Sequence, residues 1–201
     1  MTKTSMTELD ARQRVVIAAA DLLAQHGLNG SSIREVVKHA DAPFGSTYHH
    51  FPGGKQQIVA EAVAYSAAQI ADRLEQLLAL GIHDGFAGFI AMWRQALLKS
   101  NFSRGCPVMA AAVEEPVDGS SAQVLSAADQ AFVTWRGMLS RTLQQADVAP
   151  AQADSTALLC LSAIEGAIVM CRAAQQIEPF DLVTAQLQQL LKQLLAEKIS
   201  G

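Results

Sequence analysis

The chain has 201 residues, of which 50% are hydrophobic, only 5% aromatic and 17% charged, and its formal net charge is −4. This length allows one domain, or a small and a medium one, that folds unaided, and three cysteines without Cys-x-x-Cys spacing argue against a disulfide framework or a structural zinc. No signal peptide and no run of 18 or more uncharged apolar residues is present, so we expect a soluble, cytoplasmic protein.

Apolar residues at helical spacing, interrupted by glycine and proline, predict an all-α chain of about nine helices. A first helix is expected over 8–26, with Thr7 as its cap and Gly27 at its end. The remaining helices are expected near 32–39, 44–50, 54–80, 84–100, 107–114, 120–147, 151–176 and 180–199.

The second and third of these helices form the most informative part of the sequence. Ser32 and Glu35 have the spacing of a capping box, and Ile33, Val36 and Val37 then fall on one side of a short helix. Asp41-Ala-Pro43 interrupts that helix and allows a new one to begin. A short helix, a tight turn and a second short helix predict a helix-turn-helix, which presents its second helix to the major groove of DNA.

The end of this segment carries a family resemblance. Tyr48-His-His-Phe51 followed by Lys55 resembles the N-terminal signature of the TetR (tetracycline-repressor-like) family, over roughly residues 8–58. Phe51-Pro-Gly-Gly-Lys55 and Gly105-Cys-Pro107 are similar to its LmrA/YxaF-like subgroup. Pro43-Phe44 departs from the basic or small polar residue often found just after the turn, which bears on one phosphate or base contact and on the preferred DNA sequence.

The resemblance implies a set of DNA-contacting positions. These are Ser32, Arg34, Phe44, Gly45, Ser46, Tyr48, His49 and Lys55. Most of them would touch phosphate and fix the register, whereas Arg34, Phe44 and Ser46 are the candidates for base edges.

The charge is divided unevenly along the chain. Residues 1–55 carry a balance of +1 and hold four of the five histidines, whereas the remainder carries −5. DNA affinity depends on cations gathered in one place, and this footprint is weakly basic, so tight binding would need two copies. We therefore expect a homodimer.

The last two long helices are the predicted dimer interface. Residues 155–174 are apolar nearly all round and rich in small residues, and the final helix repeats leucine at spacings of three and four. Two such helices from each subunit would form a four-helix bundle. The alternative is that both helices are core of a monomer.

The middle helices concentrate large and adaptable side chains that could line a site for a small apolar or aromatic effector. The candidates are Phe89, Met92, Trp93, Met109, Trp135, Met138 and Met170. Ordinary core packing is the alternative. Glu165 and Arg172 are added because a lone charge in an apolar helix is costly, so they either orient a polar group of the ligand or pair with Arg94, Arg136 or each other.

No catalytic motif stands out in the sequence. There is no glycine-rich phosphate loop, Gly-x-Ser-x-Gly or His-Glu-x-x-His, so we expect no enzyme, no cofactor and no metal site. Cys106 before Pro107 is either a redox or electrophile sensor or an inert buried thiol.

The sequence therefore predicts a helix-turn-helix DNA-binding domain (1–53) and a helical ligand-binding and dimerisation domain (54–201). The predicted function is that of a ligand-responsive repressor which binds a pseudo-palindromic operator as a homodimer and is released by its effector. A helical enzyme or carrier is the alternative.

Overall fold

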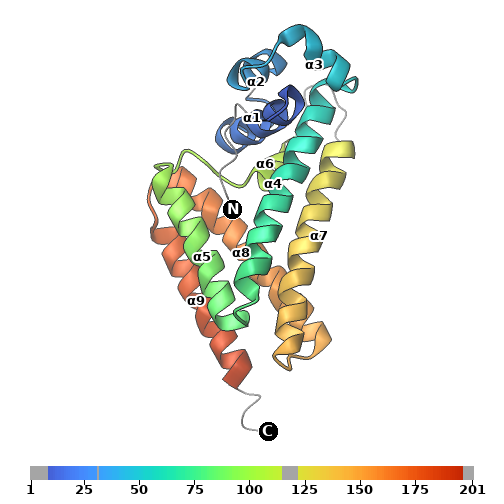
Figure 1. Ribbon diagram of the computed structural model, residues 1–201. Helices are drawn as coiled ribbons and strands as arrows, with labels where there is room; N and C mark the ends of the chain where they lie inside the picture. The colour runs from blue at the N-terminus through green and yellow to red at the C-terminus, as the bar shows by residue number, and fades with distance from the viewer. Residues whose placement is uncertain (1–8, 31, 115–121, 197–201) are drawn as a thin grey trace. The chain divides into compact units, whose positions relative to one another are not determined.

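The computed structural model describes residues 9–30, 32–114 and 122–196, and of Ser46 the backbone alone. These residues form nine α-helices and no strand, which confirms the predicted all-α class (Figure 1). The helices are α1 (Ala11–His26), α2 (Ile33–His39), α3 (Phe44–His50), α4 (Gly54–Leu78), α5 (Ile82–Lys99), α6 (Pro107–Val113), α7 (Ala122–Gln145), α8 (Pro150–Ala174) and α9 (Glu178–Ala196).

The start of the first helix differs from the prediction. α1 begins at Ala11 rather than at residue 8, because the side chain of Asp10 accepts a hydrogen bond from the Gln13 backbone N–H and caps the helix. Thr7, the predicted cap, lies outside the described residues. The predicted end is correct, since Gly27 follows the last helical residue with a φ of 75°.

The chain forms two compact units. The first comprises Met1–Ala68 and Cys106–Ala131, and the second comprises Gln69–Gly105 and Phe132–Gly201. Two long helices, α4 and α7, are therefore each divided between the units. The helix-turn-helix shares its unit with the first part of α4 and with α6.

The first unit is built on a buried cluster that joins α1, α2 and the start of α4. Its members include Val15, Ala18, Leu22, Val36, Phe51, Ile58 and Ala62, with Ile33 packed against it. The face of α2 that the sequence pattern predicts to be apolar is therefore the face that packs against the core.

α6 is attached to the end of α1 by one carboxylate. Glu114, the residue that ends α6, accepts hydrogen bonds from the backbone N–H groups of Leu28 and Asn29, each at 3.1 Å, and from the Asn29 side chain at 3.3 Å. Gly27 is favoured here by its positive φ, and a Cβ atom at this position would also overlap the Glu114 carboxylate, whose side chain would have to shift.

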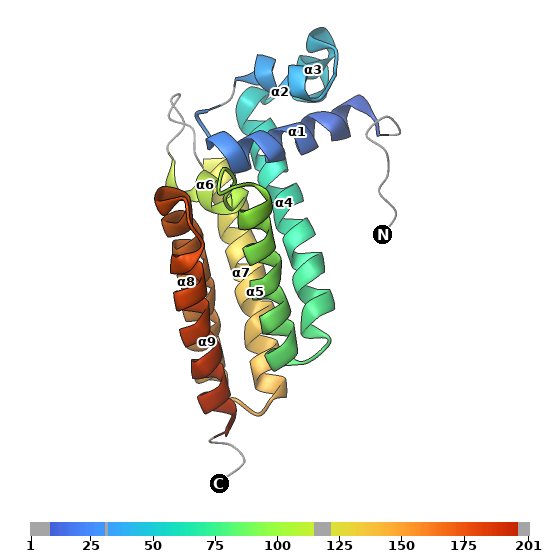
Figure 2. The ribbon, with the colours of Figure 1, turned by 90° about the vertical axis from the view of Figure 1, so that its left-hand side faces the viewer.

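The second unit contains α5, α8, α9 and the ends of α4 and α7. α8 and α9 run antiparallel side by side after a short connection, as both views show (Figures 1 and 2). α8 is long and apolar enough to cross a membrane by length and composition alone, but 44% of its most apolar stretch is already buried in this unit. Its buried face includes Cys160, Ile164 and Ile168.

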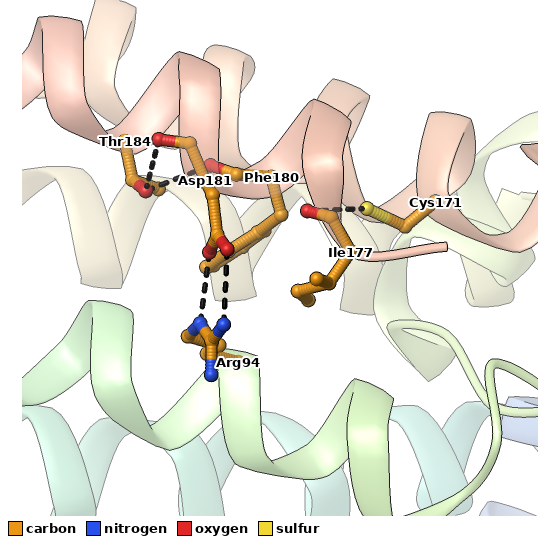
Figure 3. A network of polar contacts seen from close by, with 6 residues as sticks. All are labelled: Arg94, Cys171, Ile177, Phe180, Asp181 and Thr184. Carbon is orange, nitrogen blue, oxygen red and sulfur yellow. Dashed lines mark hydrogen bonds and ion pairs between the residues drawn. The ribbon is translucent and has the colours of Figure 1, made fainter. Parts of the chain in front are cut away.

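An ion pair holds the first turn of α9 on α5. The guanidinium of Arg94 donates to both carboxylate oxygens of Asp181, at 2.8 and 3.0 Å (Figure 3). These bonds raise the pKa of Arg94. One turn further along α9, Thr184 is buried and donates to the Phe180 carbonyl at 2.7 Å, so its hydroxyl is satisfied within the helix.

We predict that Glu114→Ala lowers the free energy of unfolding by about 2 kcal/mol, because hydrogen bonds to a charged group contribute about 1.5–3 kcal/mol. Urea denaturation followed by circular dichroism measures the change. Glu75→Ala, which removes an exposed carboxylate from α4, is the matched control and should cost less than about 0.5 kcal/mol. Equal losses in the two variants would show that the Glu114 contacts do not stabilise the fold.

Candidate nucleic-acid interface

α2 begins with the predicted capping box. The Ser32 hydroxyl accepts the Glu35 backbone N–H at 3.2 Å, and the Glu35 carboxylate accepts the Ser32 backbone N–H at 2.7 Å. The pKa of Glu35 is lowered chiefly by that backbone hydrogen bond and then by the Ser32 hydroxyl, with smaller effects from the charges of His26 and Lys55. The first residue of the helix-turn-helix is therefore fixed by local hydrogen bonds.

The turn between α2 and α3 is held by Arg14 of α1. Its guanidinium donates to the carbonyls of Ala40 and Asp41, each at 3.1 Å, and to the Leu9 carbonyl at 2.9 Å. Asp41 has a φ of 47°, a left-handed conformation that aspartate tolerates better than most residues. Arg14 thus satisfies carbonyls in the turn and fixes the direction in which α3 leaves it.

α3 is anchored by two residues on its inner side. Thr47 is 3% exposed and donates to the Pro43 carbonyl at 3.2 Å, one turn back. Phe51, which ends the helix, is 1% exposed, and the guanidinium of Arg12 lies 5.2 Å from its ring centroid. Because the inner side of α3 is held in the core, the opposite side faces solvent.

The exit from α3 into α4 is also tied to α1. Arg12 donates to Glu61 at 2.7 Å, and Gln57 donates to the same carboxylate at 3.0 Å. The amide oxygen of Gln57 accepts the Gly53 backbone N–H at 2.9 Å. This chain of hydrogen bonds orders the loop just before Lys55, which is half-buried and lines a small apolar cavity of about 20 Å³.

The structure brings three predicted contact residues together on the exposed side. The guanidinium of Arg34 lies 5.9 Å from the ring centroid of Phe44, and the rings of Phe44 and Tyr48 meet edge to face at 5.8 Å. Phe44 is 43% exposed and Tyr48 54% exposed, although both are large and partly apolar. An exposed aromatic pair beside a cation is therefore the main chemical feature of this surface.

The other predicted contact residues lie around this cluster. Ser32, Gly45 and His49 are exposed, and a Cβ atom at Gly45 would have no neighbour within 4 Å. Ser46 lies on α3, and its side chain is outside the described part of the chain. The exposed end of α2 and the exposed side of α3 thus form one surface that a groove of DNA could meet.

Sequence reasoning missed the residues that orient this surface: Arg12, Arg14 and Glu114. Each acts on a backbone or side chain at least 26 positions away, so no local spacing identifies its partner. Arg12 and Arg14 are two basic residues of the same amphipathic helix. From the sequence alone, this pattern indicated only that the helix has an exposed face.

The residues predicted to line an effector site divide between core and surface. Phe89, Trp93 and Trp135 are buried, and Met92 and Met138 are half-buried, all in the second unit. Met109 lies half-buried on α6 in the first unit. Met170 is 56% exposed on α8.

The two predicted charged residues of α8 have different surroundings. Glu165 is 6% exposed and is one of the buried residues of α8. Arg172 donates to the Ser103 carbonyl at 3.3 Å, and a Cβ atom at Gly105 would lie 2.9 Å from its guanidinium. The two arginines considered as partners have other acids beside them, since Arg94 pairs with Asp181 and Arg136 with Asp154.

The cysteines are separate and buried. Cys106, Cys160 and Cys171 are all buried thiols, and burial raises the pKa of Cys160 to about 12 and also raises that of Cys171. Thiols with raised pKa values are poor nucleophiles at neutral pH. Among residues 9–30, 32–114 and 122–196, no three histidine, cysteine or acidic side chains are placed to hold a metal ion.

Comparison with known proteins agrees with the helix-turn-helix. Residues 16–62 match the model for bacterial regulatory proteins of the tetR family, and residues 83–186 match that for the LmrA/YxaF-like transcriptional regulator C-terminal domain. An uncharacterised HTH-type transcriptional regulator of Mycobacterium tuberculosis is 35% identical over 190 residues, covering 93% of this chain and 97% of the relative. The HTH-type transcriptional regulator LmrA of Bacillus subtilis is 29% identical over 192 residues, covering 91% and 97%.

Solved structures share the fold. A TetR regulatory protein from Rhodobacter sphaeroides superposes with a TM-score of 0.80 at 21% identity, covering 89% of this chain and 97% of that one. A TetR transcriptional regulator from Legionella pneumophila gives 0.78 at 17% identity, covering 90% and 97%. The fold, the two family models and a relative that matches nearly the whole length all indicate the same family. The members of this family are transcriptional regulators rather than enzymes. The chain belongs to the TetR family of bacterial transcriptional regulators and carries an LmrA/YxaF-like C-terminal domain.

Proposed function

We propose that this regulator is a homodimeric, ligand-responsive repressor that works in the cytoplasm and places α3 of each subunit in the major groove of a pseudo-palindromic operator. The observation that carries the proposal is the exposed surface of Arg34, Phe44, Tyr48 and His49, backed by the buried anchors Thr47 and Phe51. A rigid backing is needed because base contacts depend on how precisely the helix is held.

The direct test is an electrophoretic mobility shift with the DNA upstream of the chain's own gene. A retarded band at nanomolar protein that a mutated inverted repeat removes would support the repressor. Absence of any shift, even at low salt, would contradict the proposed DNA-binding surface.

The outward faces of α8 and α9 support dimerisation. Residues 11 positions apart lie on nearly the same side of a helix, so one face of α8 carries both ends of an exposed apolar strip. This strip comprises Leu158, Leu159, Val169 and Met170, each about half exposed, with Gly166 between them in the sequence. On α9, Leu182 is 63% exposed. A surface of this kind normally marks a protein interface.

The second unit supports an effector site. Large aromatic and methionine side chains lie on α5 and on α7 in a chain that is otherwise poor in aromatic residues. Within α7, Phe132 and Trp135 form an edge-to-face pair with ring centroids 5.6 Å apart. Glu165 adds a buried carboxylate that could bind a polar group of the ligand. We propose that a small apolar or aromatic effector binds here and shifts the equilibrium toward the state with lower DNA affinity.

We predict that Lys55→Met weakens binding equally on all DNA sequences and lowers the salt slope by about one unit, because a phosphate contact releases counterions without distinguishing bases. Methionine retains an apolar stem against the cavity, so the effect reports the charge. Titrations by fluorescence anisotropy at several salt concentrations measure it. Lys99→Met, at the exposed last residue of α5, is the control and should change neither quantity. An unchanged slope in Lys55→Met would remove Lys55 from the interface.

We predict that Gly166→Leu converts the dimer to a folded monomer, because a Cβ atom there would have no neighbour within 4 Å in the subunit and the added side chain projects outward. Light scattering at micromolar protein measures the mass. Leu159→Glu and Val133→Glu form a matched pair, since both residues are 50% exposed and only the first is on α8. A monomeric wild type, or dissociation by both glutamates alike, would contradict this interface.

We predict that an effector from a panel of planar aromatic compounds quenches the emission of Trp93 and Trp135, the two tryptophans of the chain. The same titration should lower DNA affinity by about 5- to 150-fold, the usual range of allosteric coupling. Trp93→Phe and Trp135→Phe each leave one reporter, and free tryptophan corrects for non-specific quenching. Ligand affinity unchanged in both variants would place the site elsewhere.

A further inference from the structure

The chemistry of Phe44 limits what it can contact in DNA. Its ring has neither charge nor hydrogen-bond donor, so it gains little from a phosphate, yet it is 43% exposed at the first position of α3. In the major groove the apolar group on a base edge is the C5-methyl of thymine, and phenylalanine is among the side chains that contact it. The partner that suits Phe44 is therefore a methyl group.

Arg34 is the charged residue beside Phe44 on this surface. Its guanidinium lies 5.9 Å from the Phe44 ring centroid, close enough for a cation–π contact that keeps the two side chains together. Arginine bonds guanine through O6 and N7 in the major groove. Successive bases on one strand are about 3.4 Å apart, so two groups at this distance reach bases no more than two steps apart.

Tyr48 completes the arrangement. Its ring meets Phe44 edge to face at an interplanar angle of 83° and is one helical turn further along α3. An edge-to-face pair restrains the Phe44 ring, so less side-chain freedom is lost when the ring meets DNA.

Resting on the proposed function, we propose that Arg34 and Phe44 act as one specificity element, in which Phe44 contacts a thymine methyl and Arg34 a guanine within two base steps of it. Each half-site then contains this thymine and guanine. Base discrimination at the thymine depends on its methyl group and not on hydrogen bonding.

The experiment changes the DNA before it changes the protein. Duplexes selected by the full-length protein from a random pool give the half-site, and each thymine in turn is replaced by deoxyuridine, which lacks only the 5-methyl group. At one thymine per half-site the wild type should lose about fourfold in affinity, the equivalent of one buried methyl group. In a matched set, 7-deazaguanine replaces each guanine and removes the N7 acceptor.

Protein variants then assign the two contacts. Phe44→Ala should bind thymine and deoxyuridine duplexes equally, while keeping its sensitivity to 7-deazaguanine; Arg34→Ala should show the reverse. Phe44→Leu, which retains an apolar side chain, should keep part of the thymine preference.

The outcomes separate this inference from the function it rests on. If no deoxyuridine substitution affects the wild type, or if Phe44→Ala remains equally sensitive to it, Phe44 does not contact a thymine methyl. If the sensitive guanine lies more than two steps from the sensitive thymine, the paired element is wrong. The wild-type titrations alter only the DNA, so misfolding of a variant cannot affect the deoxyuridine and 7-deazaguanine results obtained with the wild type. Failure to enrich any duplex would count against DNA binding itself.

Discussion

The candidate DNA-binding surface depends on the hydrogen bonds between the Arg14 guanidinium and the carbonyls of the turn that follows α2. α2 and α3 have seven residues each, and helices this short are not stable alone in water. Their direction must therefore come from contacts with longer elements. Arg14 provides it at the turn, and Phe51 provides it at the end of α3, where it is buried in the core that α1 and α4 share.

The compact unit that contains the helix-turn-helix also includes α6 and the first part of α4. The Glu114 carboxylate binds the turn after α1, so α6 and the DNA-binding helices belong to one compact unit although about 85 residues separate the bonded groups. Any displacement of α6 would act on Leu28 and Asn29, which lead directly into the capping box of α2.

Two exposed apolar surfaces have different characters. On α3 the aromatic pair is small and lies beside a cation, which suits a base edge in a polar groove. On α8 and α9 the exposed residues are aliphatic, and small residues lie between them, which suits close approach of another helix. The chain thus carries two exposed apolar surfaces of different chemistry, one aromatic beside a cation and one made of larger apolar side chains with small residues between them.

The sequence by itself determined the helices, the capping box at Ser32 and Glu35 and the family, because these depend on residues a few positions apart and on a short local signature. The start of α1 was predicted less accurately from the sequence, because Asp10 is one of several nearby polar residues that can cap a helix. Only the tertiary structure decided the partners of Arg14 and Glu114, the burial of Trp135 and the exposure of Phe44. The physical reason is that a hydrogen bond within a turn is set by local spacing, whereas a contact between distant segments is set by how whole helices pack, and many pairings satisfy the same charge or the same apolar side chain.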